Sequence, residues 1–180
     1  RTPRSLHDNS PLRELLIRRV KLERIDEALA HQALRAVSIT CSGYNSGQSV
    51  SFFQGQPDIE PWRRSQRLGT NIKIEIDHLM ASSAIPFLFP AVKLNREYFG
   101  DGSMRQVAPI PPAIHLGAEK ILVVGAGRMT EENDRPEVLG YPTLAQIAGH
   151  TLSSIFLDSL SMDLERITPI NQTLSMIAME

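Results

Sequence analysis

Apolar residues recur every three or four positions near both ends of the chain, which predicts amphipathic helices there. In residues 11–30 the apolar positions keep this spacing with arginine and glutamate between them. Ser10 followed by Pro11 supplies a helix start, because serine caps free N–H groups and proline tolerates the first helical position. A second stripe of the same period begins at about Thr143. We expect one helix over 11–30 and a helical segment over 143–180.

Between these helices the apolar period changes to two, which is typical of half-buried strands. The expected elements are a hairpin of strands 37–41 and 49–53, a loop over 55–69, a short strand over 72–76, a helix over 78–84 capped by Asp77, a hairpin of strands 92–94 and 97–99, and a helix over 111–116 that ends at Gly117. The uninterrupted apolar run Ile121–Val124 predicts a strand buried on both faces, as in a parallel sheet. Strands alternating with helices make α/β the expected fold class.

Composition narrows the class of protein. A chain of 180 residues suits one domain, and its formal charge of −1 argues against a nucleic-acid partner bound through bulk charge. A single cysteine, Cys41, excludes an internal disulfide and a multi-cysteine zinc site. The five histidines lack the spacing of a metal motif, so no metal site is expected. No apolar run approaches the roughly 18 residues of a membrane span.

One carboxylate stands out by its neighbours. Asp101 lies between Gly100 and Gly102, directly after the second hairpin. Glycines let the backbone turn sharply, so a carboxylate at such a tip projects into a cleft. From spacing alone, an ordinary turn aspartate is the simpler interpretation.

Two motifs include or precede Asp101: the chain reads ASSAIPFLFPAV over 81–92 and YFGDGS over 98–103. These residues resemble the patatin-like phospholipase family, in particular its bacterial members, and this order of motifs is specific for that family. The block APIPPAIHLGAEKILVV over 108–124 is similar to the family's next segment, and 143–171 is similar to its C-terminal helices. The resemblance spans roughly residues 34–171.

This resemblance implies a serine acyl hydrolase with a Ser–Asp dyad, in which Asp101 would be the base and Gly100 and Gly102 would support its turn. Ser103 stands where the family has glycine or alanine, a departure that leaves the carboxylate untouched. A free aspartate, with a pKa of about 3.9, is a weak base for a hydroxyl. The chemistry therefore needs a desolvated carboxylate beside the serine and donors for the oxyanion. No metal or organic cofactor is implied, and the expected substrate is a lipid or lysophospholipid ester, degraded through an acyl-enzyme.

The nucleophile of such an enzyme is missing. The family's serine lies in G-x-S-x-G at a strand-to-helix elbow, preceded by a glycine-rich oxyanion loop, and these 180 residues contain neither. In Gly43–Gly47, Ser46 stands fourth rather than third, and the stretch around Ser49 lacks its second glycine. Both run into a strand where an elbow needs a helix, so we expect no nucleophile in this chain and no activity from it alone.

We therefore expect the C-terminal part of a three-layer patatin-like fold with a mainly parallel sheet, lacking its N-terminal strands and nucleophile elbow. Residues 1–10 would form a tail or linker, 11–142 the part of the catalytic domain, and 143–180 a helical segment packed on it. Exposed sheet edges would favour association of copies into a homo-oligomer. We expect a cytoplasmic protein that makes transient contact with a membrane surface.

Two alternatives stay open. One is a non-catalytic interaction or membrane-binding module derived from the same fold, in which Trp62 and the basic run Arg63, Arg64 and Arg67 would meet lipid headgroups. A solvated loop is the simpler interpretation of that run. The other is a fragment that joins a separately expressed N-terminal piece and is active only in that combination.

Overall fold

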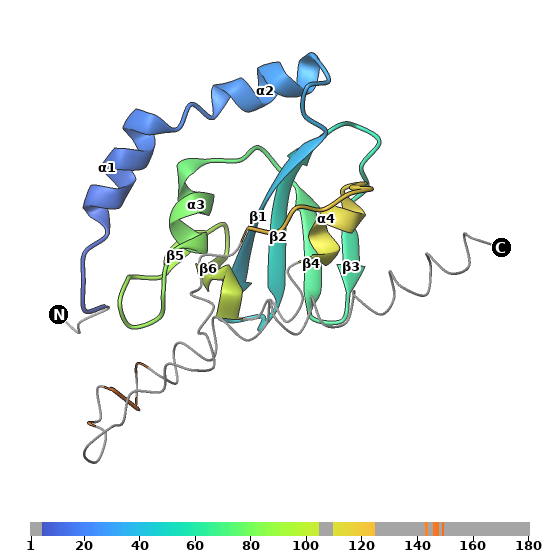
Figure 1. Ribbon diagram of the computed structural model, residues 1–180. Helices are drawn as coiled ribbons and strands as arrows, with labels where there is room; N and C mark the ends of the chain where they lie inside the picture. The colour runs from blue at the N-terminus through green and yellow to red at the C-terminus, as the bar shows by residue number, and fades with distance from the viewer. Residues whose placement is uncertain (1–4, 105–109, 125–142, 144–145, 148, 150–180) are drawn as a thin grey trace, which may run out of the picture. The chain divides into compact units, whose positions relative to one another are not determined.

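The computed structural model describes residues 5–104, 110–124, 143, 146–147 and 149 (Figure 1). The chain divides into two compact units, Arg1–Glu119 and Lys120–Glu180, and the fold described below is that of the first. Its elements in chain order are α1 (Ser10–Arg19), α2 (Glu23–Ala30), β1 (Ala36–Gly43), β2 (Ser49–Gly55), β3 (Trp62–Arg64), β4 (Arg67–Asn71), α3 (Ile76–Ser82), β5 (Val92–Leu94), β6 (Glu97–Asp101), a 3-10 turn (Gly102–Met104) and α4 (Pro111–His115).

The strands form one open sheet of six, in the order β3-β4-β2-β1-β6-β5. The hairpins β1–β2, β3–β4 and β5–β6 are antiparallel, as is the pair β1–β6. Only β2 and β4 run parallel in the part of the chain that the structure describes. Helices and strands are mixed, which is compatible with the expected α/β class, but the expectation of a mainly parallel sheet is wrong for these residues. Short turns join the two strands of each hairpin, and a short turn can only produce an antiparallel neighbour.

The apolar core lies between α3 and one face of the sheet. Cys41 and Phe52 from the central strands pack there against Ile74 and Phe99, and each is at most 5% exposed. The rings of Phe52 and Phe99 meet edge to face, with centroids 5.3 Å apart, a favoured aromatic geometry. On the opposite face, the ring of Trp62 is stacked between Phe53 of β2 and His115 of α4. Helices therefore lie on both faces of the sheet.

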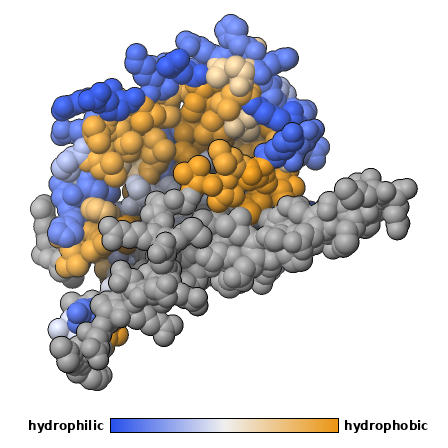
Figure 2. Space-filling view, viewed as in Figure 1, coloured by the Kyte–Doolittle hydropathy of each residue, from blue (hydrophilic) through white to orange (hydrophobic). Residues whose placement is uncertain are grey.

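The predicted helix over 11–30 is broken. Val20 takes an extended conformation at the end of α1, and α2 starts three residues later. The break lets α1 contact α3 while Leu22 and Ile25 reach the core of the sheet, which one straight helix could not do. Both helices run along the upper rim in Figure 1, and Figure 2 shows that this rim is largely hydrophilic.

Both predicted hairpins are confirmed, whereas the segment between them differs from the prediction. The expected loop over 55–69 contains β3 and most of β4, and the expected strand over 72–76 has no ladder partner. Isoleucine alternation there serves a different purpose: Ile74 enters the core, and its N–H donates to the Gln54 side chain at 2.9 Å. Helix α3 is capped by Glu75 and His78 rather than by Asp77, which lies inside the helix.

The segment after α4 was predicted to contain a helix-ending glycine and a buried strand. Gly117 follows α4 with a φ of +88°, as a helix-ending glycine should. Ile121–Val124 forms no strand, so the predicted doubly buried strand is wrong: Leu122 and Val124 are exposed. A solid apolar run identifies a segment suited to burial, but it does not supply the strands that would pair with it. Most of 143–180 lies outside the described residues.

No helix among the described residues combines the length and the apolar character needed to cross a bilayer.

Candidate active site

Asp101 is the last residue of β6, where the second hairpin meets the centre of the sheet. It lies opposite Cys41 of β1 in an antiparallel ladder. Its N–H donates to the carbonyl of Ala84, just after α3, at 3.0 Å. The aspartate is therefore fixed between the central strand and the end of a helix, which are two independent supports for its position.

The two glycines beside Asp101 are required for different reasons. A Cβ at Gly102 would overlap the carbonyl oxygen of Thr40 and come 2.8 Å from its carbonyl carbon, so backbone stands in the way. A Cβ at Gly100 would meet the side chain of Tyr44, with the hydroxyl at 2.5 Å. Tyr44 is partly exposed and has room to move. Gly102 thus supports the turn through close packing of the backbone, and Gly100 does so more weakly.

One oxygen of the Asp101 carboxylate is held in place. Oδ1 accepts hydrogen bonds from the backbone N–H of Ser103 at 2.9 Å and from its hydroxyl at 2.5 Å. The sequence showed Ser103 only as a departure from the family motif, and its hydroxyl gives that departure a role. Within the described residues, Oδ2 accepts no hydrogen bond.

Asp101 opens onto a cleft of about 560 Å³. Its lining comes from β1, the C-terminal end of α3 and the turn after β6: Ser38, Ile39, Thr40, Leu79, Ser82, Ser83, Asp101, Gly102 and Ser103. Four of its hydroxyls are already engaged. Ser82 donates to the Thr40 carbonyl and Ser83 to the Leu79 carbonyl, the Ser103 hydroxyl donates to Asp101, and the Thr40 hydroxyl is hydrogen-bonded to that of Ser51. The Ser38 hydroxyl is buried without a partner among the described residues. These groups were not identified from the sequence, because only the meeting of three elements brings them together.

The cleft lies along an unpaired stretch of β1. Strand β6 pairs only with Cys41–Gly43, and it ends at Asp101. The N–H of Gly43 donates to the carbonyl of Gln48, on the side of β2, so the odd-numbered residues of β1 direct their N–H and C=O groups toward β2. The even-numbered residues direct theirs to the other side, toward β6. Past Asp101, at Ser38 and Thr40, these groups face no strand within the described part of the chain.

The charge of Asp101 affects two neighbours. Burial, and then the negative charge of Asp101, raise the pKa of the Cys41 thiol to about 12. Burial and Asp101 also raise the pKa of Tyr44. Cys41 is therefore a neutral core residue rather than a nucleophile, because the reactive form of cysteine is the thiolate.

Neither serine that resembles a nucleophile motif reaches Asp101. Ser46 lies in the turn after β1, where its Oγ accepts from the N–H of Gln48 at 3.2 Å. Ser49 lies opposite Ser42, whereas Asp101 lies opposite Cys41, so the two side chains leave opposite faces of the sheet. The described residues hold no group of three side chains of His, Cys, Asp or Glu placed to bind a metal.

The chain was compared with known protein families, curated proteins and solved structures. A family model described as patatin-like phospholipase matches residues 1–114, which include β1–β6 and the Asp101 turn. The match begins earlier than the resemblance seen in the sequence, and it stops before the similar segments beyond residue 114. Searches of curated proteins and of solved structures found no match.

Proposed function

This chain belongs to the patatin-like phospholipase family, and we propose that Asp101 is the general base of a Ser–Asp dyad that hydrolyses a carboxylic ester of a lipid. The observation that supports this role is the carboxylate itself: Oδ1 is held by Ser103, and Asp101 lines an open cleft. A base must be rigid and within hydrogen-bond reach of the proton that it removes. The family's lipid substrates make a lipid or lysophospholipid ester the expected reactant, met transiently at a membrane surface.

In the proposed reaction, a serine hydroxyl donates a hydrogen bond to Oδ2 of Asp101 and attacks the ester carbonyl. Its proton passes to the carboxylate and then to the leaving alcohol, which leaves an acyl-enzyme. A water molecule next gives its proton to Asp101 and attacks the acyl group. The serine oxygen leaves with that proton, the fatty acid departs, and Asp101 is ionised again.

The serine of this dyad is absent from the 180 residues, because no G-x-S-x-G occurs in them. We propose that it comes from polypeptide outside this sequence and occupies the cleft beside Ser38 and Thr40. The unpaired stretch of β1 supports this placement, since a strand added there would end close to Asp101. The 180-residue chain alone should therefore hydrolyse no ester.

A fluorophosphonate probe, which forms an adduct with activated serines, tests the proposal. On the isolated chain, intact-mass analysis should show 20.0 kDa and no adduct. In the native source, the probe should label a G-x-S-x-G serine, either on the polypeptide that carries the Asp101 turn or on one bound to it. Asp101→Asn should abolish this labelling.

Glu97→Gln is a suitable control, because it removes a carboxylate of the same hairpin that bonds the turn at Asn45 and Ser46 instead of facing the cleft. An adduct on Ser46 or Ser49 of the isolated chain would refute the missing nucleophile. Labelling that survives Asp101→Asn would refute the dyad and favour the non-catalytic module.

A further inference from the structure

The tip of the β3–β4 hairpin places two arginines directly opposite each other. Arg64 and Arg67 are partners in the register and flank the two-residue turn Ser65–Gln66. Like charges opposite each other in a sheet are destabilising. Four ion pairs occur among the described residues, and none includes either arginine. The hairpin therefore carries two adjacent positive charges without an acidic partner in that part of the chain.

These arginines line a small enclosed pocket on the face of the sheet covered by α4. Besides Arg64 and Arg67, its lining consists of Ser49, Ser51, Trp62, Pro111, Pro112 and His115. The register explains the grouping, because Ser49 lies opposite Arg67 and Ser51 lies opposite Gly69 on the parallel strand β4. The ring of Trp62 lies over Gly69, where a Cβ would overlap it.

The pocket offers hydrogen-bond donors and lacks a carboxylate. Its hydroxyl-bearing residues are deeply buried, with Ser49 7% and Ser51 4% exposed. The Ser51 hydroxyl lies 3.1 Å from that of Thr40, and it keeps its own proton for a ligand when Thr40 is the donor of that bond. The charge of Arg64, after burial, lowers the pKa of His115, so the guanidinium is close to the imidazole. A volume of about 40 Å³ gives room for roughly three water-sized groups, which is the scale of the free oxygens of a phosphate.

We propose that this pocket binds a phosphate group, held by Arg64 and Arg67 and by the hydroxyl groups of Ser49 and Ser51. A planar guanidinium donates two parallel hydrogen bonds to phosphate oxygens, and a dianion between two guanidiniums removes their repulsion. The stacked rings of Trp62 and His115 form one wall and keep the pocket narrow. The same chemistry would accept free phosphate or the phosphate of a lipid headgroup.

This site is distinct from the Asp101 cleft and does not depend on hydrolysis. Arg67 and Ser49 share one face of the sheet, whereas Asp101 shares the other face with Cys41. The basic run is also not one patch, because Arg63 lies opposite Leu68, a residue packed against the core on the far face. Trp62 is held between two rings, so the pocket rather than an inserted tryptophan would contact a headgroup.

Titration of the full chain with inorganic phosphate, at constant ionic strength set with chloride, tests the proposal. The protein has one tryptophan, Trp62 in the pocket wall, so its fluorescence should change and saturate, and phosphate should raise the melting temperature. Arg64→Gln and Arg67→Gln should each weaken binding at least about tenfold, since each removes charge-assisted hydrogen bonds to the phosphate.

Arg63→Gln is the matched control, because it removes the same charge one residue away on the other face. It should bind phosphate like the unmodified chain, and so should Asp101→Asn. Flotation with phosphatidic acid vesicles distinguishes a lipid headgroup from free phosphate as the ligand. A headgroup site is identified if the chain floats with the vesicles, if inorganic phosphate competes this away and if Arg67→Gln abolishes it. Saturable titration by phosphate without flotation identifies a site for free phosphate.

Two results would overturn the proposal. One is the absence of saturable binding at millimolar phosphate by a chain whose circular dichroism shows it folded. The other is an equal loss of binding in all three arginine variants, which would indicate diffuse charge attraction instead of a site. Without phosphate, Arg64→Gln and Arg67→Gln should be at least as stable as the unmodified chain, because each removes a like-charge pair.

Discussion

Substituting alanine for Gly102 should destabilise the fold far more than the same change at Gly100. The new methyl group at Gly102 would stand 2.8 Å from the carbonyl carbon of Thr40, where ordinary contact begins at 3.4 Å. The obstacle is backbone of the central strand, held by the β1–β2 ladder and by the Ser82 hydroxyl. The chain must therefore move by more than half an ångström, or the ladder must open.

Overpacking of this kind typically destabilises a fold by about 1–3 kcal/mol. We expect Gly102→Ala to lower the free energy of unfolding by about 3 kcal/mol, because the obstacle is backbone and no side chain can move aside. At Gly100 the obstacle is the side chain of Tyr44, which is 46% exposed and can rotate outward, so the cost should stay below about 1 kcal/mol. Urea denaturation followed by far-ultraviolet circular dichroism measures both values. With a slope of about 1–3 kcal/mol/M, the midpoint of Gly102→Ala should fall by about 1 M or more.

Gly102→Ala should be the less stable of the two variants, whatever the size of each effect. If Gly102→Ala unfolds at the same urea concentration as the unmodified chain, backbone packing does not explain the glycine. If Gly100→Ala proves the less stable variant, the support of the Asp101 turn has been assigned to the wrong glycine.

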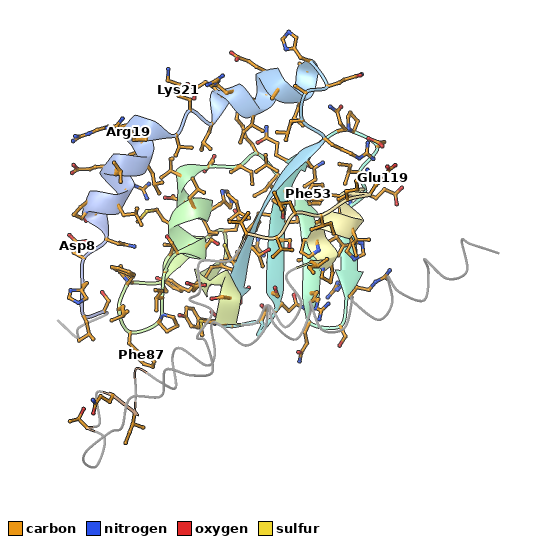
Figure 3. The ribbon with its side chains drawn as sticks, in the orientation of Figure 1. Asp8, Arg19, Lys21, Phe53, Phe87 and Glu119 are labelled. Atoms are coloured by element: carbon orange, nitrogen blue, oxygen red, sulfur yellow. The ribbon has the colours of Figure 1, made fainter. Side chains whose placement is uncertain are left out.

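Three further predictions concern other parts of the first unit. Phe87 is 75% exposed, has a φ of +65° and lies on a loop away from the sheet (Figure 3). Phe87→Gly should therefore raise the stability of the fold by about 0.5–1 kcal/mol, because it relieves left-handed strain and loses little burial, and an unchanged or lower melting temperature would contradict this. The pKa of Cys41 is about 12, so the folded state keeps the thiol proton that the unfolded chain loses near pH 9. The stability of the fold should therefore fall as the pH rises from 9 to 12. The urea midpoint of Cys41→Ala should fall less over the same range. Burial and the charge of Arg64 lower the pKa of His115, whose ring centroid lies 4.7 Å from that of Trp62. Tryptophan fluorescence should therefore titrate with a midpoint below pH 6.5, and the stability of the fold should decline as the pH falls through that range. His115→Gln should abolish the fluorescence step.

Local patterns predicted two of the three hairpins and missed β3–β4, which lies in a segment predicted to be a loop. The turns at Gly43–Gly47 and at Asn95–Arg96 are encoded in adjacent residues, and both hairpins formed as expected. The pairing of β2 with β4 depends on residues far apart in the chain, and periodicity carries no information about such partners. For the same reason the break at Val20 was not foreseen, since it reflects what α1 and α2 pack against and not their own spacing.

The candidate site shows the same division. The motif around Asp101 identified the carboxylate and its glycines, because their order along the chain is itself the signal. The hydroxyl of Ser103, the cleft beside β1 and the opposed pair Arg64 and Arg67 depend on register and on where β6 ends. Those features arise only when the sheet assembles, so no single segment could reveal them.

The partial pairing of β1 gives one strand two different local stabilities. Amides at Ile39 and Cys41 point into the ladder with β2, whereas those at Ser38 and Thr40 point toward the cleft. Amide hydrogen exchange should therefore alternate along the strand, with slow protons beside fast ones, although all lie in the middle of the sheet. Anything that settles beside Asp101 and bonds to this edge would slow the fast set alone. The exchange of two amides is thus a direct, label-free measure of occupancy at the cleft.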